Sequence, residues 1–207
     1  MKIIQCEQKS DAWYEARRGV PTASNFDQII TPKTMKVSTS SRKLACDLVG
    51  QLHYPGPMAE LETYQSPAMK NGNALEAESR AAYSMIRDID VVQVGFVMDD
   101  LGRFGCSPDG LVGNDGGMEL KNPKYETHIR YLDDGVMPDD YLCQVHGSLI
   151  VTGRQWWDFV SYARGLPPFI TRVTPNDFTQ KLSNAMDVFW AQFAELRDKI
   201  QTMKDAS

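Results

Sequence analysis

The sequence has few cysteines, few histidines and no long hydrophobic run, and each shortage excludes a class of protein. Its four cysteines include no Cys-x-x-Cys pair, which excludes a zinc ribbon or a clustered iron–sulfur site and favours reduced thiols. The three histidines have no metal-ligand spacing, so we interpret each as a surface or packing residue. No stretch approaches the roughly 20 apolar residues of a membrane helix, and the N-terminus does not resemble a signal peptide. We therefore expect a soluble cytoplasmic protein with no membrane partner.

Several common catalytic motifs are also missing from the chain. There is no Gly-x-x-x-x-Gly-Lys-Ser/Thr phosphate loop, no His-Glu-x-x-His helix and no Gly-x-Ser-x-Gly elbow. The 109–120 window fails as a calcium loop, because Leu111, Gly113 and Leu120 stand where oxygen-bearing side chains are required. Nucleotide-triphosphate, zinc-protease, serine-hydrolase and EF-hand chemistry are thereby set aside.

Positive charge is in short supply, since the formal net charge is −5. The chain as a whole does not attract nucleic acid, so DNA contact would require a local basic patch. The best candidate is residues 31–43, which contain Lys33, Lys36, Arg42 and Lys43 and no acid. This run of Thr, Ser and Pro predicts a flexible connection that either follows a phosphate backbone or is simply solvated.

The length of 207 residues, without internal repeats or low-complexity segments, predicts one domain over residues 1–207. Apolar periodicity and capping residues predict helices near 10–19, 22–30, 41–52, 73–86, 138–151 and from 174 onward. Short apolar or β-branched runs predict strands at 91–98, 103–106, 156–162 and 169–173, in addition to a pair around 109–121. This pattern favours an α/β fold with a central mixed sheet flanked by helices.

The most informative stretch places Asp109, from Ser-Pro-Asp-Gly-Leu, before a glycine-rich turn that leads to Glu119 and Lys121. If both runs are strands, Glu119 and Lys121 share one face while Leu120 points to the core. Residues 113–117 tolerate positive φ, so a hairpin can fold Asp109 back toward Glu119. Two carboxylates and an ammonium would then share a small volume.

Carboxylates held that close together favour a hard divalent cation such as Mg²⁺ or Mn²⁺. We therefore hypothesise a metal-dependent phosphodiester hydrolase in which Asp109 and Glu119 bind metal and Lys121 orients water or offsets developing charge. Glu76 is a possible additional member, although a glutamate expected in the first turn of a helix also has a purely structural explanation. Taken alone, Asp…Glu-x-Lys recurs by chance in many proteins.

Two predicted helix starts lie close together near the N-terminus, at Ser10 and around Thr22, with Arg17 between them. Helix-start amides, hydroxyls and a guanidinium group together suit a phosphate. Two ordinary capped helices beside a solvated arginine pair explain the same residues more simply, so the residues alone favour that structural explanation.

With these residues placed, the chain resembles the phage lambda-type alkaline exonuclease family, a viral recombination branch of the PD-(D/E)xK nuclease superfamily. The resemblance spans about two-thirds of the chain through ordered motifs, which are Asp11-Ala12-Trp13, Arg17, Gly19-Val20, Thr22-Ala23-Ser24, Gly72 with Glu76, Cys106-Ser107-Pro108-Asp109-Gly110-Leu111, Glu119-Leu120-Lys121 and Gln144-Val145.

This resemblance implies a restriction-endonuclease-like core and a Mg²⁺-dependent exonuclease, with Mn²⁺ as a substitute and two ions per active site. Such an enzyme digests one strand of linear double-stranded DNA from the 5′ end to mononucleotides and leaves 3′ overhangs for single-strand annealing. It further implies a homotrimeric ring around DNA and a single-strand annealing protein as partner. Alternatives are a structure-specific or restriction-type endonuclease on the same core, and a non-catalytic DNA-end-binding subunit.

The resemblance also assigns roles to individual residues. The implied metal ligands are Asp109, Glu119 and the backbone carbonyl of Leu120, with Lys121 as the catalytic lysine and Glu76 and Gln144 in support. The implied 5′-phosphate pocket consists of Arg17, Ser24 and Ser107, and Met69 falls where the family places a wedge that separates the strands. The chain departs from the family at Asn71 and at His146-Gly147, which affects strand separation and the lining beside Gln144 rather than cleavage.

Overall fold

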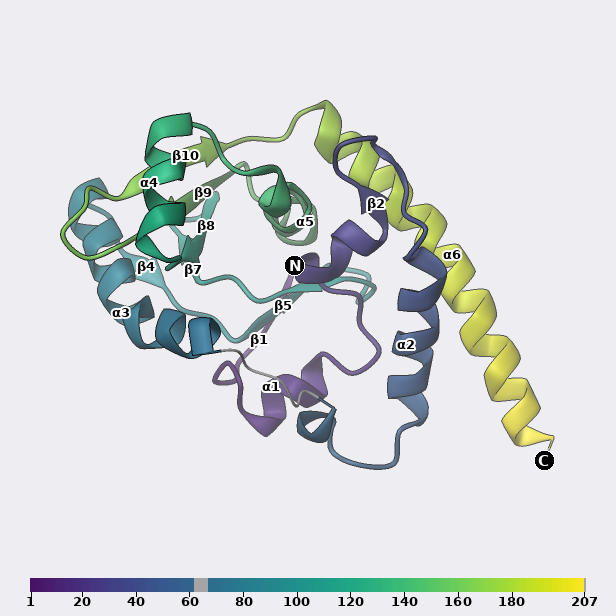
Figure 1. Ribbon diagram of the computed structural model, residues 1–207. Helices are drawn as coiled ribbons and strands as arrows, with labels where there is room; N and C mark the ends of the chain where they lie inside the picture. The colour runs from purple at the N-terminus through teal and green to yellow at the C-terminus, as the bar shows by residue number, and fades with distance from the viewer. Residues whose placement is uncertain (62–66, 207) are drawn as a thin grey trace.

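The computed structural model describes the backbone of residues 1–61 and 67–206, with side chains throughout these ranges except at 67–74. In this part of the chain a mixed five-stranded sheet lies at the centre of the fold (Figure 1). Its strands, in spatial order, are β10 (Phe169–Val173), β9 (Trp156–Ser161), β8 (Gly116–Lys121), β7 (Gly110–Val112) and β4 (Val91–Val92). Strands β8 and β9 run parallel, and the other neighbours pair antiparallel. The predicted central mixed sheet is confirmed.

The hairpin between β7 and β8 forms as the glycine-rich turn predicts. Gly110 pairs with Met118 and Val112 with Gly116, and Gly113 adopts a φ of +52° in the turn. Gly117 also needs to be glycine, because a Cβ there would lie 2.3 Å from the buried Trp157 ring. Close packing of the β8 backbone against β9 therefore sets the position of the strand that carries Glu119.

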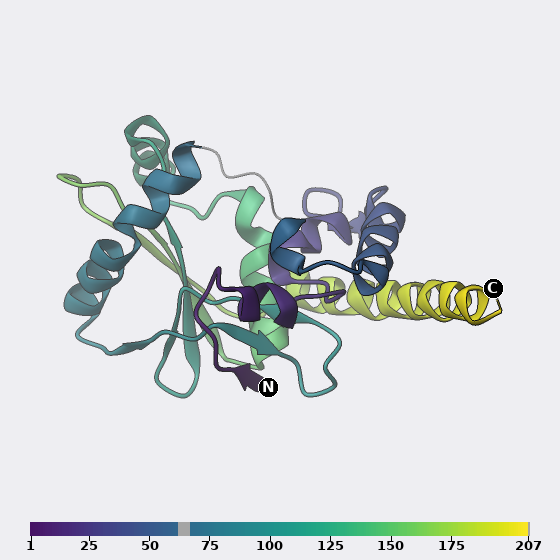
Figure 2. The same ribbon diagram turned by 90° about the horizontal axis from the view of Figure 1, so that it is seen from below.

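Helices cover the two faces of the central sheet, as Figure 2 shows for α3 (Pro67–Arg87) and α5 (Leu142–Thr152) on opposite sides. Met118 and Leu120 point toward α3 and form a small apolar cluster with Tyr83. The larger core lies on the other face, between the sheet and α5, and continues to α2 (Ser41–His53) and α6 (Asp177–Asp205). Each face of β8 thus meets different surroundings, and only the α5 face receives polar side chains from β8.

The predicted strand 91–98 is in fact two strands in two sheets. After β4 the chain leaves the central sheet, and β5 (Phe96–Met98) joins β1 (Lys2–Ile4) and β6 (Gly105–Cys106) in a small antiparallel sheet of order β1-β5-β6. The change of sheet occurs around Gly95, where a Cβ would lie 2.1 Å from the carbonyl oxygen of Cys6. The apolar pattern is continuous across this point, which is why the sequence predicted one strand.

The N-terminal region differs from its prediction in three places. Helix α1 (Asp11–Ala16) is capped by Ser10 Oγ, as predicted, but the second expected helix is a short 3₁₀ helix, η1 (Ala23–Gln28). Thr22 makes no side-chain cap bond there. Part of the expected flexible connection forms the hairpin of β2 (Ile30–Thr31) and β3 (Lys36–Val37). Phe26 lies within η1 and is fully buried. We attribute the short 3₁₀ helix to this tertiary packing, which outweighs the local preference for an α-helix.

The remaining helices agree with the sequence more closely. Helix α2 matches its prediction to within a residue at its end, whereas α3 begins six residues earlier than predicted and α6 is capped at Asn176 rather than at Thr174. Helix α4 (Tyr125–Asp134) was not predicted, and short 3₁₀ turns, η2 (Met58–Glu60) and η3 (Asp139–Tyr141), complete the described elements. The C-terminal end of α6 extends away from the central sheet (Figure 2). None of the helices in the described ranges has the length and apolar character needed to cross a membrane.

Candidate active site

Strand β8 and helix α5 together position three polar side chains. Lys121 Nζ donates a hydrogen bond to Glu119 Oε1 at 2.7 Å and a second to Gln144 Oε1 at 3.3 Å. Gln144 Nε2 donates to the same Glu119 oxygen at 2.6 Å. Glu119 is only 3% exposed, so these donors satisfy a buried carboxylate and hold its orientation. The spacing argument that placed Glu119 and Lys121 on one strand face is confirmed, and α5 adds Gln144 to them.

Asp109 enters the same region from the other strand of the hairpin. Its Oδ2 accepts a hydrogen bond of 2.6 Å from the backbone N–H of Leu120, so the carboxylate lies against the strand that carries Glu119. Burial, followed by repulsion from Glu119, raises the pKa of Asp109 to about 8, although Lys121 and the Leu120 amide oppose the shift. Asp109 and Glu119 together can carry two negative charges, and Lys121 alone can neutralise only one of them.

Lys121 is subject to opposite influences. Burial disfavours its charged form, but Glu119 and then Asp109 outweigh burial and hold the pKa of Lys121 above its ordinary value. The ammonium also lies 4.9 Å from the centre of the Tyr141 ring, a favourable cation–π position. Lys121 is therefore a stable cation beside the two carboxylates.

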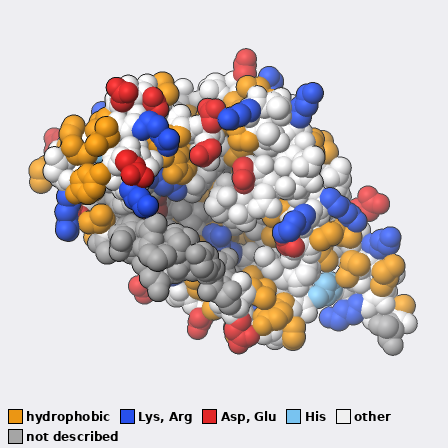
Figure 3. Space-filling model, viewed as in Figure 1, with side chains coloured by type: hydrophobic (Ala, Val, Ile, Leu, Met, Phe, Trp, Pro, Cys, Tyr) orange, Lys and Arg blue, Asp and Glu red, His pale blue; other side chains and the backbone are white. Residues whose placement is uncertain are grey.

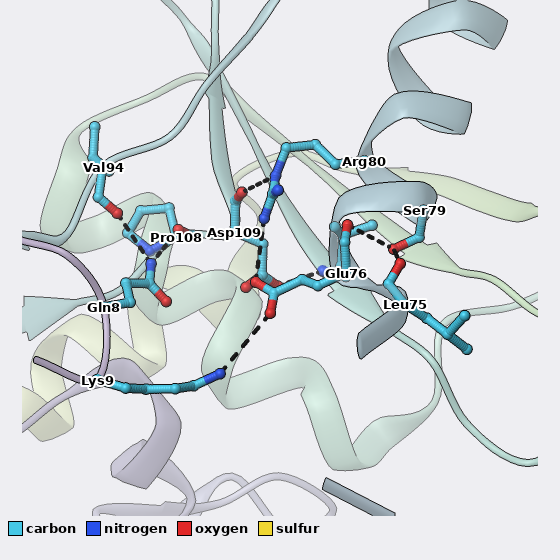
Figure 4. Close-up of polar contacts among 10 residues, drawn as sticks. Gln8, Lys9, Leu75, Glu76, Ser79, Arg80, Val94, Pro108 and Asp109 are labelled. Carbon is cyan, nitrogen blue, oxygen red and sulfur yellow. Dashed lines mark hydrogen bonds and ion pairs between the residues drawn. The ribbon is translucent and has the colours of Figure 1, made fainter. Parts of the chain in front are cut away.

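Glu76, on α3, lies close to Asp109 (Figure 4). Its Oε1 accepts a hydrogen bond of 3.2 Å from Arg80 Nη2, and its Oε2 lies 3.9 Å from Lys9 Nζ. Because α3 begins at Pro67, Glu76 lies in the helix interior and not in the first turn as predicted. The helix-dipole explanation for Glu76 is therefore wrong. Its negative charge contributes to raising the pKa of Asp109, which places it in the electrostatic range of the site.

The N-terminal arginine meets the serine of the central motif across 90 residues of sequence. Arg17 Nη1 donates to Ser107 Oγ at 3.3 Å, and Trp13 Nε1 donates to the same hydroxyl at 2.9 Å. The Arg17 guanidinium stacks 4.1 Å from the centre of the Trp13 ring. Its neighbour Arg18 instead binds the carbonyl oxygens of residues 51, 54 and 56. The two adjacent arginines therefore differ in role, and only Arg17 faces the motif.

Ser24 lies near this junction without being part of the hydrogen bonds just described. It is exposed, and its hydroxyl pairs with Thr22 Oγ1 at 3.0 Å. The Thr22 backbone in turn bridges to Gly105, two residues before Ser107. The structure thus brings Arg17 and Ser107 into contact and anchors the segment of Ser24 to the strand that precedes Ser107.

An open cleft of about 430 Å³ lies beside Asp109, between residues 5–9 and α3. Sequence reasoning missed two polar side chains on its wall. Arg80 contacts the Asp109 backbone, and Gln8 donates to the carbonyl oxygens of Val94 and Pro108 at 3.0 and 2.9 Å. The spacing of Arg80 four residues after Glu76 is a local signal of an ion pair. Gln8 had no such signal.

The histidines take no part in this site, as the sequence predicted. His128 is buried, with Nδ1 2.7 Å from Ser161 Oγ and Nε2 3.1 Å from the Pro167 carbonyl oxygen. His146 is buried with Nδ1 2.8 Å from Thr179 Oγ1. Both are packing residues. His53 is partly exposed.

A family model described as the YqaJ-like viral recombinase domain matches residues 12–155, which include every site residue discussed so far except the N-terminal Gln8 and Lys9. The chain belongs to this family. The resemblance to viral recombination nucleases that the sequence motifs indicated is therefore confirmed. A search of the curated proteins finds no match.

Solved structures support the membership in this viral recombinase family. An alkaline exonuclease (LHK-Exo) from Laribacter hongkongensis superposes with a TM-score of 0.79 and 29% identity, over 95% of this chain and 99% of that one. The complex of LHK-Exo with dAMP matches with the same values. A phage-related exonuclease from Haemophilus somnus 129PT shares the fold alone, with a TM-score of 0.63 and 12% identity over 87% of this chain and 96% of that one. The α/β fold with a mixed sheet flanked by helices is thus that of a nuclease.

The residues of this family member fit the hard cation that the resemblance implies. Among the described residues, no three His, Cys, Asp or Glu side chains are arranged to hold a metal ion. The implied ligand set is different, because it combines two carboxylates with a backbone carbonyl at Leu120. Burial is the first cause of the raised pKa of Asp109 and repulsion from Glu119 is the second, and a divalent cation bound by the oxygens of both acids would relieve that repulsion. Asp109, Glu119 and the Leu120 carbonyl would hold it.

The suggested strand-separating residue, Met69, lies in the first turns of α3. Its side chain is outside the described residues, and so is that of Asn71, where the chain departs from the family pattern. The wedge assignment remains a prediction.

Proposed function

We propose that the protein is a Mg²⁺-dependent 5′-to-3′ exonuclease that digests one strand of linear double-stranded DNA to mononucleotides. The observation that carries the proposal is the connection of two sites through one short segment. Ser107 belongs to the Arg17 cluster, and Asp109, two residues later, belongs to the cluster of Glu119 and Lys121. A terminal phosphate held at the first cluster would place the adjacent phosphodiester at the second.

This connection favours action at a DNA end. An endonuclease has no need of a phosphate pocket at a fixed short distance from the cleaved bond, because its substrate continues on both sides. Arg17 offers a guanidinium already oriented by Trp13 and Ser107, which suits the terminal phosphate better than a mobile surface arginine. Ser24 would complete the pocket when its hydroxyl turns from Thr22 to the phosphate.

The chemistry assigned to the second cluster follows from its charges. When bound, Mg²⁺, or Mn²⁺ in its place, lowers the pKa of water and stabilises the attacking and leaving oxygens, and we propose two ions per site as in related phosphodiester hydrolysis. Lys121 is a cation before substrate arrives, since Glu119 and Asp109 keep its pKa raised despite burial. It would hold water through Nζ and offset negative charge on the phosphorane. Gln144 would keep Glu119 and Lys121 in register through its two hydrogen bonds.

The comparisons support the reaction class rather than its details. LHK-Exo is an alkaline exonuclease, and its complex with dAMP contains a nucleoside monophosphate, the kind of molecule that an exonuclease releases. The polarity, the metal and the use of the 3′ overhangs rest on the resemblance and on the residues described above.

We further propose that three copies form a ring around DNA and that a single-strand annealing protein receives the 3′ overhang. Acidic and basic side chains are interspersed on the face shown in Figure 3, in keeping with the net charge of −5. A chain with such a surface gains little non-specific affinity for DNA from its overall charge. Enclosure of the duplex would retain DNA without a strongly basic exterior.

The decisive experiment uses linear duplex DNA labelled separately at its 5′ and 3′ ends, with Mg²⁺, with Mn²⁺ and with a chelator. We expect 5′ label to appear as mononucleotide while 3′ label stays on long single strands, and the chelator should stop the reaction. Release of 3′ label first would show the opposite polarity.

Covalently closed circular DNA distinguishes the alternatives in the same assay. Cutting of circles would favour a structure-specific or restriction-type endonuclease. Binding of DNA ends without any cleavage, in either metal, would favour a non-catalytic end-binding subunit.

A further inference from the structure

Arg80 occupies a central position on the cleft wall beside the proposed cleavage site (Figure 4). Its side chain is only 12% exposed and uses separate nitrogens for separate partners. Nε donates to the backbone carbonyl oxygen of Asp109 at 3.0 Å, and Nη2 donates to Glu76 Oε1 at 3.2 Å. With its amide oxygen turned toward Arg80, Gln93 accepts from Nη1 at 3.0 Å and from Nη2 at 3.1 Å. The guanidinium is thereby held in one orientation.

These contacts complete a fixed frame around Asp109. Its side chain is held by the Leu120 amide on one side, and its main chain is held by Arg80 on the other. The preceding carbonyl, of Pro108, is held by Gln8, which comes from the N-terminal segment. Two consecutive carbonyl groups of the motif therefore depend on side chains from distant parts of the chain.

The geometry of these contacts requires arginine in particular. A planar guanidinium can donate to the Asp109 carbonyl and to the Glu76 carboxylate at once, whereas an ammonium is a single point donor. The guanidinium also forms an ion pair with the Glu76 carboxylate, which would be lost with the arginine. Arg80 touches neither Lys121 nor Glu119 in the contacts described.

We propose that Arg80 is a positioning residue for DNA cleavage, which sets the orientation of Asp109 and Glu76 toward the metal and the substrate. This inference rests on the proposed nuclease function. Arg80 acts through Asp109 and Glu76 and makes no direct contact with the reacting atoms. Residues that orient metal ligands in this way typically change metal affinity or activity by about 10- to 100-fold when they are replaced.

The test compares Arg80→Lys and Arg80→Gln with a matched control, Arg154→Lys. Arg154 also binds backbone carbonyl oxygens of the same hairpin, those of Val112, Gly113 and Gly116, but at its turn. Three quantities are measured for each variant, which are kcat and KM on 5′-phosphorylated linear duplex, affinity for Mn²⁺ alone by calorimetry without DNA, and thermal stability.

For Arg80→Lys we expect kcat to fall about 10- to 100-fold and the Mn²⁺ Kd to rise about 10-fold, while KM for DNA changes little. Arg80→Gln should be at least as impaired. Arg154→Lys should lower Tm by a few degrees and leave kcat and the Mn²⁺ Kd at wild-type values. Loss of kcat without a matching loss of Tm is the signature of positioning.

The inference is overturned if Arg80→Lys keeps wild-type kcat and Mn²⁺ affinity. It is also overturned if Arg80→Lys and Arg154→Lys both reduce kcat only in proportion to their loss of Tm, since that pattern means a structural role. If the wild-type chain does not cleave DNA, the proposed function fails on its own. The Mn²⁺ titrations of Arg80→Lys against Arg154→Lys then still decide whether Arg80 orients Asp109.

Discussion

At the scale of single residues, the hydrogen bonds that the protein donates to the two acids of the site go to one oxygen of each carboxylate. Glu119 Oε1 accepts from both Lys121 and Gln144, and Asp109 Oδ2 accepts from the Leu120 amide. In the contacts among the described residues, the protein donates to one oxygen of each carboxylate, and we propose that the second oxygen faces the cation. The arrangement holds the acids still without using their whole capacity as ligands.

Lys121→Ala should reduce kcat by on the order of 10³-fold, because the positive charge beside the scissile phosphate is lost. DNA binding should stay close to wild type, since the predicted phosphate pocket is elsewhere. The measurement is single-turnover cleavage of 5′-labelled duplex together with equilibrium binding in a chelator. Lys199→Ala, an exposed lysine on α6, is the control. Wild-type cleavage by Lys121→Ala would remove the lysine from the mechanism.

Arg17→Ala should narrow the rate advantage of 5′-phosphorylated over 5′-hydroxyl ends, because the guanidinium that faces Ser107 is removed. The ratio of the two rates is measured on otherwise identical duplexes. Arg18→Ala is a matched control, since Arg18 binds backbone carbonyl oxygens near the end of α2. That variant should lose stability and keep the ratio. If Arg17→Ala keeps the wild-type ratio of the two rates, Arg17 does not belong to the 5′-phosphate pocket.

At the scale of secondary-structure elements, α5 connects the site to the rest of the molecule. One of its faces presents Gln144 to Glu119, and another packs against α6 through His146. The His146 ring lies 5.1 Å from the Phe178 ring and is 1% exposed. The helix therefore carries a neutral buried imidazole at its contact with α6.

Acid should weaken this α5–α6 contact. Burial lowers the pKa of His146 to about 4. The same histidine in the unfolded chain has a pKa of about 6.5, so the unfolded chain binds the proton more readily than the folded state. The stability contribution is complete above pH of about 6.5 and is lost as pH falls toward about 4. We expect about 2 kcal/mol less stability at about pH 5 than at neutral pH from this group.

The measurement is the free energy of unfolding by denaturant at neutral pH and at about pH 5 for wild type and His146→Gln. Glutamine retains a polar partner for Thr179 but does not titrate. The pH dependence should therefore be smaller in the variant. An equal dependence in both proteins would show that His146 is not responsible.

At the scale of the whole molecule, net charge and assembly are linked. The formal charge of −5 gives the chain no overall attraction to DNA, and the ring proposal, which rests on the family resemblance, is compatible with this charge because enclosure would retain DNA. The extended end of α6 is a further feature that one isolated copy leaves exposed (Figure 2).

Light scattering after size exclusion should give about 70 kDa, three times the 23.3 kDa of one chain. The run is repeated in raised salt, which separates a packed trimer from weak charge-driven association. A mass of one chain in both conditions would exclude the ring. It would leave the exonuclease proposal standing, because the described cluster lies within a single chain.

The sequence alone was sufficient wherever the physics is local. A glycine-rich turn between two apolar runs predicted the β7–β8 hairpin, and the two-residue period of a strand placed Glu119 beside Lys121. Helix α2, the Ser10 cap and the β9–β10 pair also followed from short-range patterns. In each case the determining contacts lie within a few residues or across one turn.

Only the tertiary structure decided what joins distant segments. In the structure, Glu76 lies in the interior of α3 and residues 91–98 form strands of two different sheets. The Arg17 guanidinium donates a hydrogen bond to the Ser107 hydroxyl. The structure also revealed Arg80, whose partners include a backbone carbonyl that no side-chain pattern encodes. Such contacts depend on how helices and sheets pack over long sequence separations, whereas sequence periodicity reports only on each element by itself.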